Sequence, residues 1–226
     1  MMRTWTRFLP AAATHLLAGM RSRSAGLNVM LSLIFLFLLS FSGEAQPRDG
    51  TVATGETLTE IWIRAARFGD LETVDALIKD DALDIDTSYS IDSKENALVV
   101  AAAAGHEEIV RSLIEAGADA DHRSDPKKST ALMRAARQGH AGVVRMLLED
   151  GGADVLLKNR VAITALHLVA MRSHHANTGI IELIVEHSPE ACFAKDLKHR
   201  TPLQLAMENG NHHGADILRE LCTSEV

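Results

Sequence analysis

Residues 97–118 read ALVVAAAAGHEEIVRSLIEAGA, and this stretch decides the fold. Its first eight residues are apolar, Gly105 interrupts them, and a second stretch follows in which Val110, Leu113 and Ile114 are three and four residues apart. Apolar residues at that spacing lie on one face of an α-helix. The stretch therefore predicts two helices joined by a tight turn at Gly105, where a positive φ favours glycine.

The same pattern recurs along the chain at a nearly constant spacing. Its leading positions are Glu60, Asn96, Thr130, Thr164 and Thr201, so the steps are 36, 34, 34 and 37 residues. Each such unit has an apolar face that only a neighbouring unit can cover, which predicts a stacked solenoid. The five units are IWIRAARFGDLETVDALIKDDA from Ile61, the stretch from Ala97, ALMRAARQGHAGVVRMLLEDGGA from Ala131, ALHLVAMRSHHANTGIIELIVEHS from Ala165, and PLQLAMENGNHHGADILRELC from Pro202.

This pattern resembles that of ankyrin repeats, T-P-L-H-x-A-A-x-x-G-H-x-x-I-V-x-x-L-L-x-x-G-A. Parts of it are nearly intact at residues 164–167 (TALH), 201–203 (TPL), 105–110 (GHEEIV) and 117–119 (GAD). The resemblance covers about residues 57–222 and implies an all-α ankyrin-repeat solenoid of helix-turn-helix units with short β-hairpin-like loops. The implied repeats are about 57–91, 92–125, 126–159, 160–196 and 197–222, followed by a tail at 223–226.

The chain departs from the family pattern at the hairpin tips. The family places a glycine two positions before the T-P-L-H threonine, whereas this chain has Lys94, Lys128, Ala162 and His199 there. Because only glycine adopts a positive φ without strain, we expect the tips to be looser than is usual in the family.

An apolar segment near the start predicts export. Residues 27–41 read LNVMLSLIFLFLLSF, four arginines and no acidic residue precede them, and Gly43 and Ala45 fit the small positions before a cleavage site. This is typical of a signal peptide over residues 1–45, with cleavage before Gln46, a linker at 46–56 and a periplasmic or secreted product. Translation from Met20 would give a more ordinary leader, and an uncleaved signal anchor or an organelle transit peptide are the alternatives.

Composition narrows the class of partner. The chain has 226 residues, 46% of them hydrophobic and 4% aromatic, which suits a globular protein with an aliphatic helical core. The net charge is −7, and without residues 1–45 the body carries 19 basic and 29 acidic residues, a net charge of −10. An acidic body lacks the counterion-release contribution to nucleic-acid affinity, so we expect no nucleic-acid partner.

The sequence contains no recognisable catalytic motif, so we expect neither an enzyme nor a cofactor. His106 begins an H-E-x-x-H-like stretch, but Val110 stands where a second metal ligand belongs. A metal site is a lesser alternative that would use two histidine pairs in adjacent repeats. The histidines are His174, His175, His212 and His213.

Cys192 and Cys222 are candidates for a disulfide, although a separation of one repeat predicts a strained bridge.

The resemblance implies a protein-binding surface formed by the hairpin tips and the inner-helix residues just before the turn glycine. The string Arg-Ala-Ala-Arg at 64–67 and 134–137 predicts a basic stripe, interrupted in the second repeat by Ala103-Ala104, for a partner that presents carboxylates. The alternative is that these residues serve only helicity and solubility. We therefore expect a monomeric adaptor, with a stress-linked metal-binding envelope protein or a secreted effector as alternatives. The candidate residues are Arg64, Arg67, Phe68, Arg134, Arg137, Gln138, Met171, Arg172, Glu208 and Asn209.

Overall fold

The computed structural model describes residues 57–80, 83–89, 95–123, 127–172 and 178–223. The chain divides into two compact units, residues 1–48 and 49–226, and every described residue belongs to the second. The predicted export segment, the linker at 46–56, Lys94 and the pair His174-His175 lie outside the described residues. No helix in the described part of the chain is long and apolar enough to cross a bilayer.

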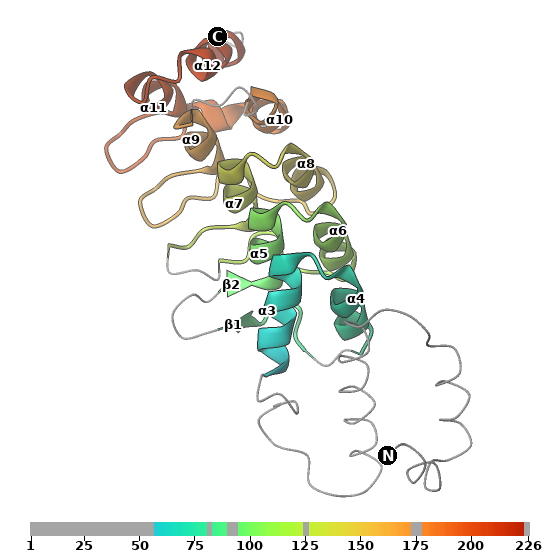
Figure 1. Cartoon of the computed structure of the whole chain (residues 1–226). Coiled ribbons are helices and arrows are strands. Elements are labelled where there is room, and N and C mark those ends of the chain that lie inside the picture. Colours follow the sequence, from blue (N-terminus) through green and yellow to red (C-terminus); the bar gives the residue numbers. More distant parts are fainter. Residues whose placement is uncertain (1–56, 81–82, 90–94, 124–126, 173–177, 224–226) are drawn as a thin grey trace, which may run out of the picture. The chain divides into compact units, whose positions relative to one another are not determined.

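Five pairs of helices stack in two columns, which confirms the predicted all-α solenoid (Figure 1). The inner column contains α3 (Leu58–Phe68), α5 (Ala97–Ala104), α7 (Ala131–Gln138), α9 (Ala165–Ala170) and α11 (Pro202–Glu208). The outer column contains α4 (Leu71–Asp80), α6 (Glu107–Glu115), α8 (Ala141–Glu149), α10 (Thr178–His187) and α12 (His212–Thr223). A 3₁₀ helix, η2 (Pro189–Phe193), follows α10, and the short strands β1 (Ser88–Tyr89) and β2 (Glu95–Asn96) pair antiparallel.

A side-chain N-cap fixes the start of every inner helix. Asn96 and the threonines at 130, 164 and 201 each accept a hydrogen bond from the backbone N–H three residues later. The first unit keeps its predicted register at Gly69, but its inner helix begins one turn earlier than the others, because α3 is capped by Thr57 and starts at Leu58. Glu60, the predicted leading residue, instead completes a capping box with Thr57 one turn inside the helix.

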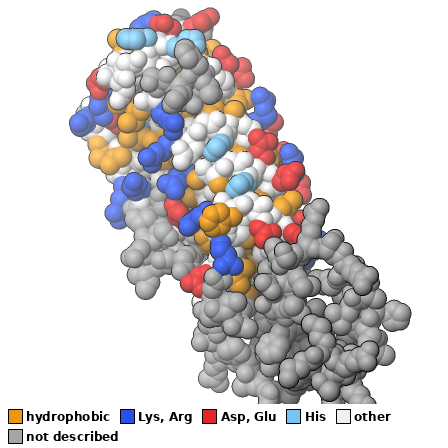
Figure 2. Space-filling view, viewed as in Figure 1, with side chains coloured by type: hydrophobic (Ala, Val, Ile, Leu, Met, Phe, Trp, Pro, Cys, Tyr) orange, Lys and Arg blue, Asp and Glu red, His pale blue; other side chains and the backbone are white. Residues whose placement is uncertain are grey.

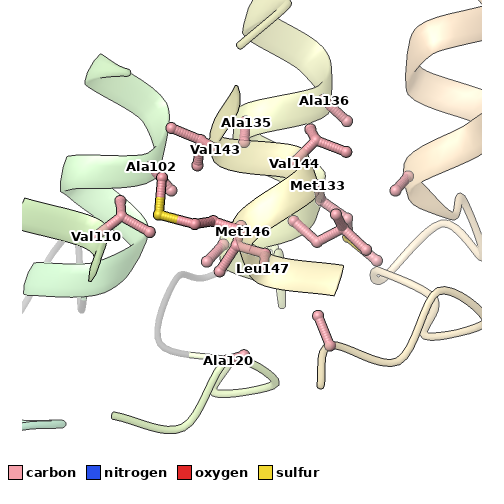
Figure 3. Packing of buried hydrophobic residues seen from close by; sticks show 14 of the residues in the cluster. Ala102, Val110, Ala120, Met133, Ala135, Ala136, Val143, Val144, Met146 and Leu147 are labelled. Carbon is pink, nitrogen blue, oxygen red and sulfur yellow. The ribbon is translucent and has the colours of Figure 1, made fainter. Parts of the chain in front are cut away.

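Small side chains let the inner helices approach one another closely. The alanine pairs 101–102 and 135–136 are completely buried where α5 and α7 meet. Val143, Val144 and Leu147 on α8 are also completely buried, and Figure 3 shows them facing the inner helices and the neighbouring repeat. The core is thus one continuous aliphatic cluster that runs along the stack, as the repeat pattern predicts.

The hairpin tips at Ala162 and His199 are tight, so the expectation of loose tips is wrong there. The tips in 87–95 and 122–129, where we expect the most looseness, lie partly outside the described residues. Lys128, Ala162 and His199 have φ of 56°, 58° and 58°, in the left-handed region that glycine occupies in the family pattern. Around Ala162, the N–H of Asn159 donates to the carbonyl of Ile163 at 3.0 Å, and the Asn159 side chain accepts from Val161 and Ile163. These hydrogen bonds close the turn and offset the backbone strain of a residue with a Cβ.

Cys192 and Cys222 form a disulfide, contrary to the expectation of a strained bridge across one repeat. Their Cα atoms are 5.8 Å apart, within the normal range for a disulfide. The expectation failed because it placed Cys192 a full repeat away from the last outer helix. Instead, η2 packs against both α10 and α12, which brings Cys192 beside the end of α12.

Candidate partner-binding surface

The ten candidate binding residues belong to the inner column of helices and the turns that follow them. We call this set of ten residues the inner-helix surface. They occupy the last turns of α3 and α7, the residues after α9, and the end of α11. All ten are exposed except Arg134 and Arg172, which are half-buried, and the Phe68 side chain is 75% exposed. Figure 2 shows Lys and Arg side chains in a column along this side of the stack, while Asp and Glu gather over the outer helices.

Glu95 lies between two of the predicted arginines and was not identified from the sequence. Its carboxylate is 2.6 Å from the guanidinium of Arg134 and 3.8 Å from that of Arg67. The second repeat therefore does more than interrupt the basic stripe with Ala103-Ala104, because it supplies a carboxylate that partly neutralises the stripe. The signal in the sequence is the position of Glu95 directly before the N-cap residue Asn96.

Arg172 contacts the end of the neighbouring inner helix. Its guanidinium donates to the backbone carbonyl of Arg137 and lies 3.5 Å from the side-chain oxygen of Gln138. A cation at a helix C-terminus interacts favourably with the helix dipole, so this contact joins α9 to α7. Among the described residues, the guanidinium of Arg137 itself has no ion-pair partner, and it is exposed.

At the C-terminal end, the predicted residue Glu208 is paired. Arg200 lies 2.7 Å from Glu208 and donates through Nε and NH2 to one oxygen of Asp196, at 2.9 and 2.7 Å. Burial opposes ionisation of Asp196, but hydrogen bonds from the Arg200 side chain and from the backbone N–H groups of Arg200 and Lys198 lower its pKa to about 2. Arg200 directly precedes the N-cap Thr201, the same position that Glu95 has in the second repeat.

Two histidines at the helix-to-helix turns join one repeat to the next. The Nε2 atoms of His106 and His140 lie 3.0 and 3.1 Å from the carbonyls of Arg67 and Ala103 in the preceding inner helices. His212 and His213 are exposed at the start of α12. No group of three or more His, Cys, Asp or Glu residues that could hold a metal ion occurs in the part of the chain that the structure describes.

His167 is completely buried in the T-A-L-H segment. Its Nε2 donates to the carbonyl of Arg200 at 3.1 Å, and its Nδ1 accepts from the hydroxyl of Thr164 at 2.8 Å. Burial lowers the pKa of His167, and it outweighs the hydrogen bond to Arg200, which acts in the opposite direction. The neutral ring thus connects α9 to the hairpin that precedes α11.

Comparison with models of protein families agrees with the repeat geometry described above. No curated protein matches the chain. Residues 62–159 match the family model described as ankyrin repeats in three copies, which spans α3 to the hairpin after α8. Ankyrin repeats are generally protein–protein interaction modules without catalytic activity. Over residues 62–159 the chain therefore belongs to the ankyrin repeat family.

Proposed function

We propose that the chain is a non-catalytic adaptor that binds a partner protein through the inner-helix surface and the hairpin tips flanking it, in the periplasm or outside the cell. The observation that carries the proposal is the set of arginines in equivalent places at the ends of α3 and α7 and after α9, with Arg137 exposed and unpaired among the described residues. Arginine binds carboxylates bidentately, so the partner presents acidic groups to this surface.

The arginines of this surface differ in whether they already form an ion pair within the protein. Arg67 and Arg134 share Glu95, so an acidic partner that binds there competes with an existing ion pair. At Arg137 no such pair exists among the described residues, and Phe68 offers an exposed aromatic ring on α3, two inner helices away. Arg and aromatic residues dominate binding energy at many protein interfaces, so Arg137 and Phe68 are the expected anchors.

The test identifies a partner and then measures its affinity. Tagged full-length protein is used to capture companions from its host, each companion is identified by mass spectrometry, and its dissociation constant is measured with purified protein. The variant Arg67→Glu/Arg137→Glu should weaken binding by about tenfold or more. The matched control is Arg111→Glu/Arg145→Glu, which makes the same charge change on the outer helices α6 and α8. Equal effects of the two variants would refute the inner-helix surface.

Export is tested on the same material. Mass spectrometry of the recovered chain should find an N-terminus at Gln46, as cleavage of a signal peptide requires. A chain that retains residues 27–41 would contradict cleavage and would favour an anchored protein.

A further inference from the structure

Three hairpins project from the same side of the stack and lie next to one another (Figure 1). They precede α7, α9 and α11. The backbone N–H of Arg160 donates to the carbonyl of Lys127 at 3.0 Å, and the Lys158 ammonium donates to the carbonyl of Lys195 at 3.1 Å. These contacts join successive hairpins into a continuous border of the solenoid, which we call the hairpin edge.

The hairpin edge is strongly basic. Seven exposed cations occur along it, and none of them forms an ion pair among the described residues. Its carboxylates lie where the hairpins leave the helices: Asp119, Asp121 and Asp154 in the first two hairpins, and Asp196 in the last, where it is buried against Arg200. The cations are Arg123, Lys127, Lys128, Lys158, Arg160, Lys195 and Lys198.

Exposed apolar side chains alternate with these cations. Val161 and Leu197 are 49% and 67% exposed at two neighbouring tips, and Leu156 and Phe193 are 39% and 61% exposed where the same hairpins begin. At the left border of Figure 2, hydrophobic and basic side chains lie side by side over the hairpins. Four exposed apolar residues on two loops need an apolar environment that another part of the described chain does not supply.

We propose that the hairpin edge binds the surface of an anionic lipid bilayer. Lysine and arginine side chains near such a surface are attracted to its negative potential, while apolar side chains enter the region between the headgroups and the acyl chains. A row of loops at one border of an elongated stack can meet a plane with all its tips at once. A nucleic acid would also attract the cations, but it offers no comparable place for Val161 and Leu197.

The acidic charge of the outer helices favours one orientation of the protein, with the hairpin edge facing the bilayer. These helices expose many acidic side chains, which an anionic surface repels, whereas the hairpin edge exposes cations. The resulting charge asymmetry directs the hairpins toward the lipid. The exposed acidic residues of the outer helices are Glu72, Asp80, Glu107, Glu108, Glu115, Glu149, Glu182, Glu186, Asp216 and Glu220.

The test is sedimentation of the full-length protein with vesicles. Vesicles of phosphatidylcholine alone are compared with vesicles that contain about 30% phosphatidylglycerol. The hairpin variant Lys127→Glu/Lys158→Glu/Lys198→Glu should bind the anionic vesicles at least about tenfold more weakly than the parent. The matched control, Lys79→Glu/Arg111→Glu/Arg145→Glu on the outer helices, has the same net charge and should keep the parent's affinity. Because all three proteins carry residues 27–41, any lipid affinity of that segment is common to them.

A second variant separates lipid binding from attraction to any polyanion. Val161→Ser/Leu197→Ser leaves the charge unchanged and should weaken vesicle binding, while binding to a single-stranded oligonucleotide should not depend on these two residues. Equal vesicle binding by the hairpin variant and the outer-helix control would overturn the proposal, and so would full vesicle affinity of the serine variant. The inner-helix variant Arg67→Glu/Arg137→Glu leaves the hairpin edge intact, so it should lose the protein partner and keep vesicle binding, which distinguishes failure of the two proposals.

Discussion

Where α5 and α7 meet, the alanine pairs 101–102 and 135–136 are completely buried. At the C-terminal end, a disulfide joins η2 to α12, and the side chain of Asn211 donates to the carbonyls of Ala170 and Arg172 at 3.1 and 2.8 Å. An interior helix pair buries both its sides, whereas the last described pair packs on one side only. A covalent bond thus reinforces the end of the stack, where a repeat has one neighbour instead of two, while polar contacts like that of Asn211 also join the interior repeats through His106 and His140.

The largest effect is expected in the apolar middle of the stack. Leu147→Ala on α8 should reduce the free energy of unfolding by about 2–5 kcal/mol, because it leaves a cavity in a completely buried site. Chemical denaturation measures the change. Met207→Ala at an exposed site of α11 is the control, with an expected change below about 0.5 kcal/mol. A comparable loss in both variants would contradict the importance of middle packing.

Removal of the disulfide should affect the C-terminal end alone. Cys192→Ala/Cys222→Ala should cost about 2–4 kcal/mol, because the bridge closes a loop across a sequence separation of 30 residues in the unfolded chain. Hydrogen exchange should become faster in α11 and α12 and remain unchanged in α5 to α8. Faster exchange throughout the stack would show that the end and the middle unfold together and would remove the contrast between them.

Acid should weaken the polar contacts before the apolar ones. The pKa of His167 is lowered from its ordinary value of 6.5, so the unfolded chain binds a proton more readily than the folded one. Stability should therefore be greatest above pH 6.5 and fall below it, by at most about 1.4 kcal/mol per pH unit for one proton. Thermal unfolding of the parent and of His167→Gln across this range measures the effect. Identical pH profiles would exclude His167 as its source.

The smallest expected effect is a gain in the free energy of unfolding. Ala162→Gly should stabilise the protein by about 0.5–1 kcal/mol, because Ala162 holds a φ of 58° that glycine adopts without strain. Ala103→Gly near the end of α5 makes the same change at a helical position and should lose about 0.5–1 kcal/mol. Opposite signs in differential scanning calorimetry would confirm that the hairpin tip is strained. A loss at both positions would contradict it.

The repeat pattern predicted the helices and the buried residues because both depend on local spacing that recurs in every unit. The inner-helix positions of the candidate residues followed from the same register. The partners of these residues were not predictable in this way, since Glu95 meets Arg134 only after a hairpin places it against the next repeat. Arg200 is a similar case, because its contacts with Asp196 and Glu208 depend on the closed form of the last hairpin.

Two further differences arose where the chain departs from the family pattern. The start of α3 was misplaced because Thr57, three residues before the aligned position, supplies the cap. The disulfide was underestimated because the segment after α10 forms η2 and packs against α12, and the helix-turn-helix pattern does not describe the connections between units. Unit-by-unit alignment is thus informative inside a repeat and least informative at the connections between repeats.

The disulfide also changes how the protein would respond to mechanical force. A pulling force applied beyond Cys222 passes through the sulfur bridge to Cys192, so α11 and α12 carry no tension. The chain between the two cysteines, about 100 Å when extended at roughly 3.3–3.6 Å per residue, cannot be stretched until the bridge is reduced. Under tension the stack would therefore unravel from α10 onward, and its last helix pair would stay folded or unfold without lengthening the chain.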